Sequence, residues 1–101
     1  MREVTVDQLA ATSDHETASI IDVREPAEYR EGHVPAARNV PMSQFTNRLD
    51  EIERDRPVYV VCASGNRSAV VAEFLTSSGI EAINVAGGTA AWIRSGRPTE
   101  K

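Results

Sequence analysis

The chain has 101 residues, a length that predicts one domain over residues 1–101 with a modest core. Apolar residues make up 41% and charged residues 26%, as in a folded globular protein and unlike a disordered one. A net charge of −4 without a dense basic run argues against nucleic-acid binding. The chain shows no apolar signal core and no membrane-length run, so we expect a cytoplasmic protein that binds no membrane, and a monomer.

The first half of the chain alternates short β-branched runs with helix-like stretches. We predict strands at residues 4–6, 18–23 and 38–40. We predict helices over residues 8–10, from 26 to about 32, and from 43 to about 52. Asp7 is placed to cap the first helix, while Pro26 suits the first turn of the second helix and Gly32 its end. The polar residues 12–17, which include His15, predict a solvated loop.

The second half continues the alternation. We predict strands at residues 58–61 and 82–85, the first of them apolar enough to be buried on both faces. The helix between them is expected over residues 68–77, with Gly79 as its C-cap. Its inward side chains are expected to be Val70, Val71, Phe74 and Leu75. Thr89 is placed to cap a last helix that carries Trp92 and Ile93.

Five strands with helices between them predict an α/β fold, a five-stranded parallel sheet with helices on both faces. Ligands of such sheets bind at the carboxyl ends of the strands. Five residues of chemical interest fall at that edge: Asp22, Arg24, Cys62, Gly87 and Gly88. The sequence therefore predicts a site around Cys62, the only cysteine of the chain, which also excludes an internal disulfide.

The segment V-V-C-A-S-G-N-R-S, from Val60 to Ser68, carries the strongest chemical signal. A loop with Gly65 can turn successive backbone N–H groups inward to form a nest for an anion, and the following helix adds its positive end. Arg67 adds a full charge. Thiols in such places ionise with pKa values of about 3.5–7.5. A cysteine after an apolar strand is often an inert core residue, but the polar loop that follows favours a reactive thiolate at Cys62.

Four segments resemble motifs of the rhodanese family, in family order and over nearly the whole chain. The loop from Cys62 to Arg67 looks like its six-residue active-site loop. The other three are I-I-D-V-R-E-P-A-E-Y (20–29), G-H-V-P-A-A-R-N-V-P (32–41) and A-G-G-T-A-A-W-I-R-S-G-R-P (86–98). The resemblance implies a rhodanese-like fold and a sulfurtransferase whose cysteine, here Cys62, carries a sulfane sulfur as a persulfide.

By this resemblance the Cys62 thiolate takes sulfur from a small donor such as thiosulfate or a persulfide and passes it to cyanide or a thiol. A sulfur-accepting protein is a further partner to be considered. The residues that would bind the substrate are those of the loop and one strand end: Ala63, Ser64, Gly65, Asn66, Arg67, Ser68 and Arg24. No cofactor is implied, and one cysteine with two distant histidines makes a poor metal site.

Two alternatives remain open at this stage. A cysteine phosphatase or arsenate reductase also uses Cys and Arg, but its loop has five residues between them, whereas here there are four, Ala63 to Asn66. The other alternative is a sulfur carrier or regulatory module without turnover. Many thiosulfate-using rhodaneses have a basic residue next to the cysteine, and Ala63 stands there in this chain, which predicts weak use of thiosulfate.

Several residues receive supporting assignments. Asp22 is expected to hold loop backbone or form an ion pair, while Arg24 could also contact an anionic donor. His33 is expected to be a hydrogen-bonded structural residue. Gly87 and Gly88 would let a second loop approach Cys62, and Trp92 is expected in the core.

Overall fold

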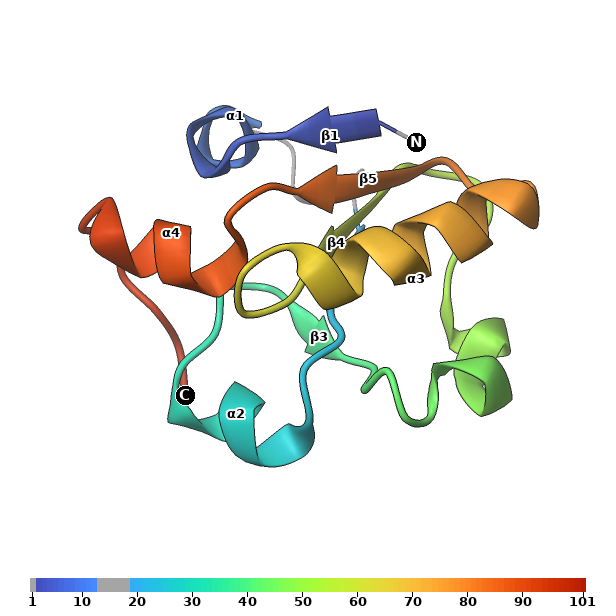
Figure 1. Cartoon of the computed structure of the whole chain (residues 1–101), viewed down its shortest axis with the longest axis horizontal. Coiled ribbons are helices and arrows are strands. Elements are labelled where there is room, and N and C mark those ends of the chain that lie inside the picture. The colour runs from blue at the N-terminus through green and yellow to red at the C-terminus, as the bar shows by residue number, and fades with distance from the viewer. Residues whose placement is uncertain (1, 13–18) are drawn as a thin grey trace.

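The computed structural model describes residues 2–12 and 19–101 of the chain. Five strands form one parallel sheet in the order β1-β5-β4-β2-β3 (Figure 1). Their bounds are Arg2–Val4 (β1), Ser19–Asp22 (β2), Arg38–Asn39 (β3), Val58–Val61 (β4) and Ala82–Val85 (β5). The predicted five-stranded parallel α/β fold is therefore confirmed.

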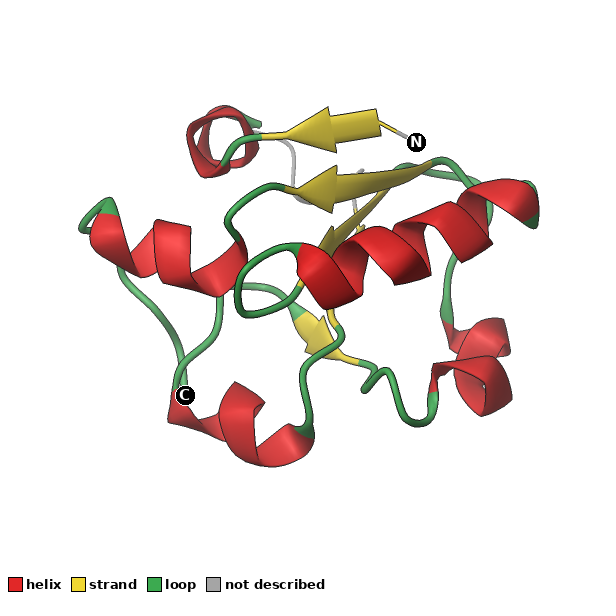
Figure 2. Cartoon of the chain, in the orientation of Figure 1, coloured by secondary structure: helices red, strands yellow, loops and turns green. Residues whose placement is uncertain are grey.

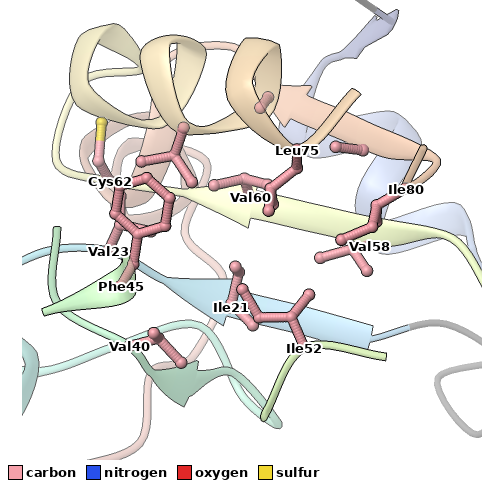
Figure 3. Packing of buried hydrophobic residues seen from close by; sticks show 13 residues of the cluster. Ile21, Val23, Val40, Phe45, Ile52, Val58, Val60, Cys62, Leu75 and Ile80 are labelled. Carbon is pink, nitrogen blue, oxygen red and sulfur yellow. The ribbon is translucent and has the colours of Figure 1, made fainter. Parts of the chain in front are cut away.

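Helices cover both faces of this sheet (Figure 2). They are α1 (Val6–Ala11), α2 (Pro26–Glu31), the 3-10 helix η1 (Phe45–Glu51), α3 (Asn66–Ser77) and α4 (Gly88–Arg94). On one face α3 and η1 pack on the strands through a cluster that includes Ile21, Val60 and Leu75 (Figure 3). On the other face α1 and α4 pack through Leu9 and Trp92, so Trp92 is a core residue. Helix α2 has no buried residue.

The N-terminal elements begin earlier than predicted. The strand predicted over residues 4–6 is wrong, because β1 ends at Val4. The prediction that Asp7 caps the first helix is also wrong, because Thr5 is the N-cap of α1. The Gln8 N–H donates to Thr5 Oγ1 (3.1 Å) and the Thr5 N–H to Gln8 Oε1 (2.8 Å), a reciprocal capping box that Asp7 cannot form with this helix. Residues 13–18, with His15 and most of the predicted polar loop, lie outside the described residues.

The helix expected over residues 43–52 is a 3-10 helix over Phe45–Glu51 instead, with Arg48 outside helical angles. Its bonds include Asn47 N–H to the Gln44 carbonyl and Ile52 N–H to the Leu49 carbonyl, both three residues apart and both 3.0 Å long. The segment contains Asn and Asp, which are weak helix formers. Few of its side chains are buried, so packing does not demand a regular α-helix.

The buried face of α3 differs from the prediction. The helix begins at Asn66 after Gly65, and its buried residues are Ser68, Val71, Ala72 and Leu75. Val70 is 58% exposed and Phe74, which contacts Phe45 edge to face, is also exposed. The spacing of the buried positions is i, i+3, i+4, i+7. This face is rotated by about one residue from the predicted face, and it turns Ser68 towards the Cys62 sulfur.

Both predicted glycine and threonine caps also need correction. Ser78 is the C-cap of α3, and Gly79 follows it at φ +88°. Gly87, not Thr89, is the N-cap of α4, and Ile93 faces solvent. The left-handed conformation of Gly87 (φ 77°) starts the helix two residues earlier than a threonine cap would.

Candidate active site

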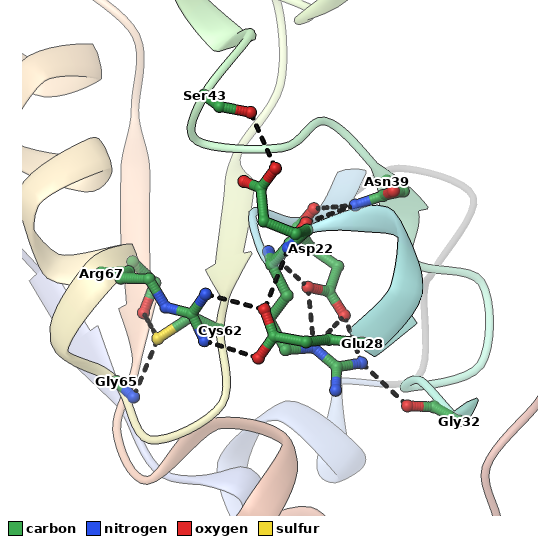
Figure 4. A network of polar contacts seen from close by, with 11 residues as sticks. Asp22, Glu28, Gly32, Asn39, Ser43, Cys62, Gly65 and Arg67 are labelled. Carbon is green, nitrogen blue, oxygen red and sulfur yellow. Dashed lines mark hydrogen bonds and ion pairs between the residues drawn. The ribbon is translucent and has the colours of Figure 1, made fainter. Parts of the chain in front are cut away.

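Cys62 follows β4 directly and lies in the turn that leads into α3. Its sulfur accepts a hydrogen bond from the Gly65 N–H (3.0 Å) and lies 3.3 Å from the Ser68 hydroxyl (Figure 4). The residue is only 1% exposed. The structure therefore brings together Cys62, Gly65 and Ser68 of the predicted loop as direct neighbours of one sulfur atom.

These contacts decide the ionisation of the sulfur. Burial acts to raise the pKa of Cys62, but hydrogen bonds from the Ser68 side chain and from the backbone of Ser68, Gly65 and Ser64 act against it. The net result is a pKa of Cys62 below its ordinary value. The largest effects that lower it come from neutral donors, so hydrogen bonds are the main stabilisers of the thiolate, and Arg67 adds a coulombic attraction to it.

The Gly65 N–H and the Ser68 hydroxyl form a cradle for the sulfur, and a second loop fixes the shape of this cradle. The Thr89 N–H donates to the Cys62 carbonyl (2.8 Å) and the Ala90 N–H to the Ala63 carbonyl (3.0 Å). A Cβ on Gly88 would lie 2.4 Å from the Cys62 carbonyl oxygen, so no other residue allows this approach. The first amides of α4 thus hold the carbonyls of the cysteine loop. The close approach expected of Gly87 and Gly88 takes place through Gly88.

A buried polar layer lies behind the sulfur. The Ser68 hydroxyl is 2.6 Å from Asn84 Oδ1, and Asn84 Nδ2 donates to Glu3 Oε2 (2.8 Å) and to the Gly65 carbonyl (3.3 Å). Sequence reasoning missed Asn84 and Glu3. The available signal was a single amide inside the apolar strand β5, since a buried polar side chain in a strand has to find partners.

Asp22 and Arg24 form a buried ion pair at the end of β2. Arg24 donates through its backbone N–H and Nε to Asp22 Oδ1 (2.9 and 3.1 Å), and through Nη2 to Asp22 Oδ2 (2.9 Å). The same Nη2 donates to the Gly32 carbonyl (2.8 Å), and Asn39 Nδ2 closes the turn on the carbonyls of Asp22 and Arg24. Arg24 is buried and engaged by these partners, so the geometry does not present it to an anionic donor.

Arg67 is also paired. Its two terminal nitrogens donate to the two oxygens of Glu28 on α2 (2.8 and 2.9 Å), as Figure 4 shows. The hydrogen bonds from Arg67 lower the pKa of Glu28 from 4.5 to about 2, against a smaller opposing effect of burial. Sequence reasoning missed Glu28, which lies 39 residues away from Arg67 in the chain. The charge expected to serve the site is therefore largely neutralised by a carboxylate.

The comparisons with known proteins now decide the family. A family model described as Rhodanese-like domain matches residues 5–95. The chain belongs to the rhodanese-like family.

Similar proteins agree with this assignment. The chain is 40% identical over 93 residues to YqhL of Bacillus subtilis (strain 168), covering 91% of this chain and 72% of that protein. It is 38% identical over 87 residues to a protein of Allochromatium vinosum named sulfurtransferase, covering 85% and 81%. The solved structure of a rhodanese-related protein from Thermoplasma volcanium superposes with a TM-score of 0.91 at 34% identity, covering 99% of this chain and 98% of that one.

Among the remaining predicted residues of this rhodanese-like domain, Ser64 acts on Cys62 through its backbone, and the others have no described hydrogen bond to the sulfur. His33 stacks on Tyr29 (ring centroids 3.7 Å apart) and its Nδ1 is 3.0 Å from the Tyr29 carbonyl oxygen. Its backbone pairs with Glu100 in the C-terminal segment. Ser64 and Asn66 are exposed at the rim, and Ala63 is half-buried beside the cysteine. His33 thus joins α2 to the C-terminal segment.

Within residues 2–12 and 19–101, no cluster of three or more His, Cys, Asp or Glu side chains is placed to hold a metal ion. In the same ranges no helix has the length and apolar character needed to span a membrane.

Proposed function

We propose that this protein is a sulfurtransferase in which Cys62 carries a sulfane sulfur as a persulfide, with residues 1–101 acting as one rhodanese domain. The observation that carries the proposal is the sulfur itself, held by the Gly65 N–H and the Ser68 hydroxyl in a place that lowers the pKa of Cys62. A thiolate at neutral pH is the nucleophile that sulfur transfer requires. Because this work needs a reduced thiol, we place it in the cytoplasm.

The first half-reaction breaks a sulfur–sulfur bond of the donor. The Cys62 thiolate attacks the terminal sulfane sulfur, a new sulfur–sulfur bond forms on Cys62, and sulfite or a thiolate leaves with the electron pair of the broken bond. The outer sulfur now carries the negative charge. Hydrogen-bond donors directed at the end of the loop suit that anion as they suit the thiolate.

The second half-reaction restores the enzyme. A nucleophilic acceptor, cyanide or a thiolate, attacks the outer sulfur, and the Cys62 sulfur leaves as a thiolate with the bonding electrons. Thiocyanate or a new persulfide is the product, and charge is conserved in both steps. Neither step needs a general base when the attacking group is the Cys62 thiolate, the cyanide anion or an acceptor thiolate.

The charge distribution supports a persulfide rather than thiosulfate as the better donor. Arg24 is engaged by Asp22, Arg67 by Glu28, and Ala63 offers no charge where many thiosulfate-using rhodaneses have a basic residue. The dianionic thiosulfate would therefore meet little free positive charge at the site. A persulfide has one charge fewer at its sulfur end and loses less from this arrangement.

A sulfur carrier without turnover is the second candidate, and the 1% exposure of Cys62 favours it. A sulfur this well covered suits a carrier whose protein partner uncovers Cys62 before transfer. Such a carrier would still gain one sulfur on Cys62. Only the enzyme would go on to repeated cycles with small donors and acceptors.

The test is steady-state turnover with thiosulfate and with glutathione persulfide as donors, alongside mass spectrometry of the protein. We expect turnover with glutathione persulfide to exceed turnover with thiosulfate, and Cys62→Ser to abolish both turnover and the gain of one sulfur. Ala63→Arg should raise the use of thiosulfate. Turnover retained in Cys62→Ser would overturn the mechanism, and sulfur gain without turnover would favour the carrier.

A further inference from the structure

A chain of polar side chains runs from the sulfur of Cys62 along the α3 face of the sheet to the edge strand β1. Ser68 lies 3.3 Å from the sulfur of Cys62 and 2.6 Å from Asn84 Oδ1, and Asn84 reaches Glu3 at 2.8 Å. Ser68 is 0% and Asn84 1% exposed. The two half-reactions of the proposed sulfur transfer give Asn84 no role. Burying its amide is nevertheless costly unless its hydrogen-bond partners are well placed.

The neighbours of Asn84 fix the orientation of its amide. Its nitrogen faces the Gly65 carbonyl (3.3 Å) and the Glu3 carboxylate (2.8 Å), which both accept hydrogen bonds and donate none. A rotated amide would turn its oxygen towards these two acceptors. Asn84 Oδ1 therefore faces Ser68 as an acceptor.

The Ser68 hydroxyl consequently stands between two acceptors with one proton to give. While Cys62 is a thiol, its S–H can donate to Ser68 Oγ, and Ser68 donates to Asn84 Oδ1. When Cys62 is a thiolate, that arrangement would leave a lone pair of Ser68 facing a negative sulfur. The proton must then rotate from Asn84 to the sulfur.

We propose that Asn84 is a positioning residue that competes with the Cys62 sulfur for the single proton of Ser68. The hydroxyl thereby changes its acceptor according to the charge on that sulfur. The amide is the stronger competitor whenever the sulfur is neutral, because Asn84 Oδ1 accepts at 2.6 Å and a neutral thiol sulfur is only a weak acceptor.

This competition fits the two half-reactions, and in that respect it rests on the proposed function. When the persulfide forms, the negative charge moves to the outer sulfur, and the inner sulfur loses its hold on the Ser68 proton. When the acceptor removes the outer sulfur, the inner one leaves as a thiolate and the hydroxyl turns back to it. Asn84 keeps the proton available between the two steps, and no proton leaves the pair.

Other charged groups near Cys62 do not replace this effect. Arg67 on α3 is paired with Glu28 on α2, Asp22 is paired with Arg24 at the end of β2, and Glu3 on β1 acts through Asn84. The turn before α4 and its first residues carry no charged side chain. Substitutions at Ser68 and Asn84 leave all of these charges in place.

The experiment measures the pKa of Cys62 from the ultraviolet absorbance of the thiolate against pH, with Cys62→Ser as the baseline. Ser68→Ala should raise the pKa of Cys62. At a fixed pH below the wild-type pKa, the fraction of Cys62 present as thiolate should fall about fivefold relative to the wild-type protein. Asn84→Ala removes the competing acceptor, so it should lower the pKa of Cys62 and raise the thiolate fraction by a similar factor. The double variant should behave like Ser68→Ala, because no proton is then left to compete for. Ser68→Thr, which keeps the hydroxyl, should restore most of the wild-type value.

A second measurement uses the unmodified protein and covers the case in which Asn84→Ala fails to fold. The side-chain carbonyl carbon of Asn84 should shift in carbon NMR spectra with the same midpoint as Cys62, because the carbonyl loses the Ser68 proton as the thiolate forms. An Asn84 signal that does not move through this range would overturn the proposal. So would a folded Asn84→Ala protein whose Cys62 pKa rises as it does in Ser68→Ala.

Both readouts are independent of sulfur transfer. Suppose that the pKa of Cys62 rises in Ser68→Ala and falls in Asn84→Ala, but that Cys62 gains no sulfur. That result would refute the proposed function and support the competition. A protein that gains sulfur and turns over, while both variants raise the pKa of Cys62, would support the function and refute the competition.

Discussion

The cradle around the sulfur and the charged cluster beside it, Asp22, Arg24, Glu28 and Arg67, which we call the mouth, are stabilised by different interactions. The cradle consists of the Gly65 N–H and the Ser68 hydroxyl, both neutral. The mouth contains four charged side chains in two ion pairs, Asp22–Arg24 and Glu28–Arg67. An acidic chain that stabilises an anion would be expected to direct its cations at that anion. Here the cations are bound by carboxylates, and backbone and hydroxyl dipoles stabilise the sulfur.

The two ion pairs also differ from each other. Asp22–Arg24 is buried and closes a turn, whereas the side chain of Glu28 in the second pair is 40% exposed. Helix α2 has no buried residue, so polar contacts such as Glu28 with Arg67 hold it against the rest of the domain. The charges of the mouth thus serve mainly to place chain segments, and the following predictions test that division of roles.

The largest effect on stability is expected at Asp22. Asp22→Ala leaves the guanidinium of Arg24 buried without its carboxylate, and the free energy of unfolding should fall by about 3–5 kcal/mol. Urea denaturation measures this loss. Asp22→Asn keeps an acceptor oxygen and should lose less. A loss below about 1 kcal/mol in Asp22→Ala would show that the buried pair does not hold the mouth together.

The next largest effect tests the cradle. Gly88→Ala places a Cβ 2.4 Å from the Cys62 carbonyl oxygen at φ +55°, so we expect a loss of about 2–4 kcal/mol and a displaced cysteine loop. Gly79→Ala is the matched control, because it has a similar φ of +88° and no atom within 4 Å. The control should lose about 1–2 kcal/mol and leave the pKa of Cys62 unchanged. Equal behaviour of the two variants would contradict a cradle built on backbone contact.

The smallest effect is expected at Glu28. The pair with Arg67 is partly exposed and screened, so Glu28→Gln should cost at most about 1 kcal/mol at pH 7. The pKa of Glu28 is depressed from 4.5 to about 2 in the folded protein. Its contribution is therefore present above pH 4.5 and is lost as the pH falls towards 2.

Urea denaturation at several pH values checks this sign. The stability difference between the wild-type protein and Glu28→Gln should shrink steadily as the pH falls below 4.5. A difference that is constant or grows in acid would mean that Glu28 is not held ionised by Arg67. Gln44→Glu, an exposed position without such a partner among the described contacts, serves as a surface-charge control.

The sequence predicts those parts of the site that are local in the chain. Strand β4, the cysteine at its end, Gly65 and the following helix are contiguous, so their chemistry is visible in one segment. The partners of that segment are not. Glu28 meets Arg67 across 39 residues and Glu3 meets Asn84 across 81, and no spacing rule connects such positions.

The buried face of helix α3 also differs from the prediction made from the sequence. Val70 and Phe74 follow the apolar pattern of α3, yet the face that is buried includes Ser68 because the sulfur occupies that side. Apolar periodicity alone cannot place a polar residue on the inner face. The buried face of α3 therefore departs from the simplest hydrophobic pattern of its sequence.

The pairing of Glu3 with Asn84 in the register of β1 and β5 has a practical consequence for handling the protein. Strand β1 has three residues and lies at the edge of the sheet, where local opening is easiest. Each such opening separates Glu3 from Asn84 and so removes one hydrogen bond from the amide that contacts Ser68 beside the thiol. An affinity tag joined ahead of Arg2 would perturb this edge, and thiol measurements on tagged and untagged samples should be compared before any variant is interpreted.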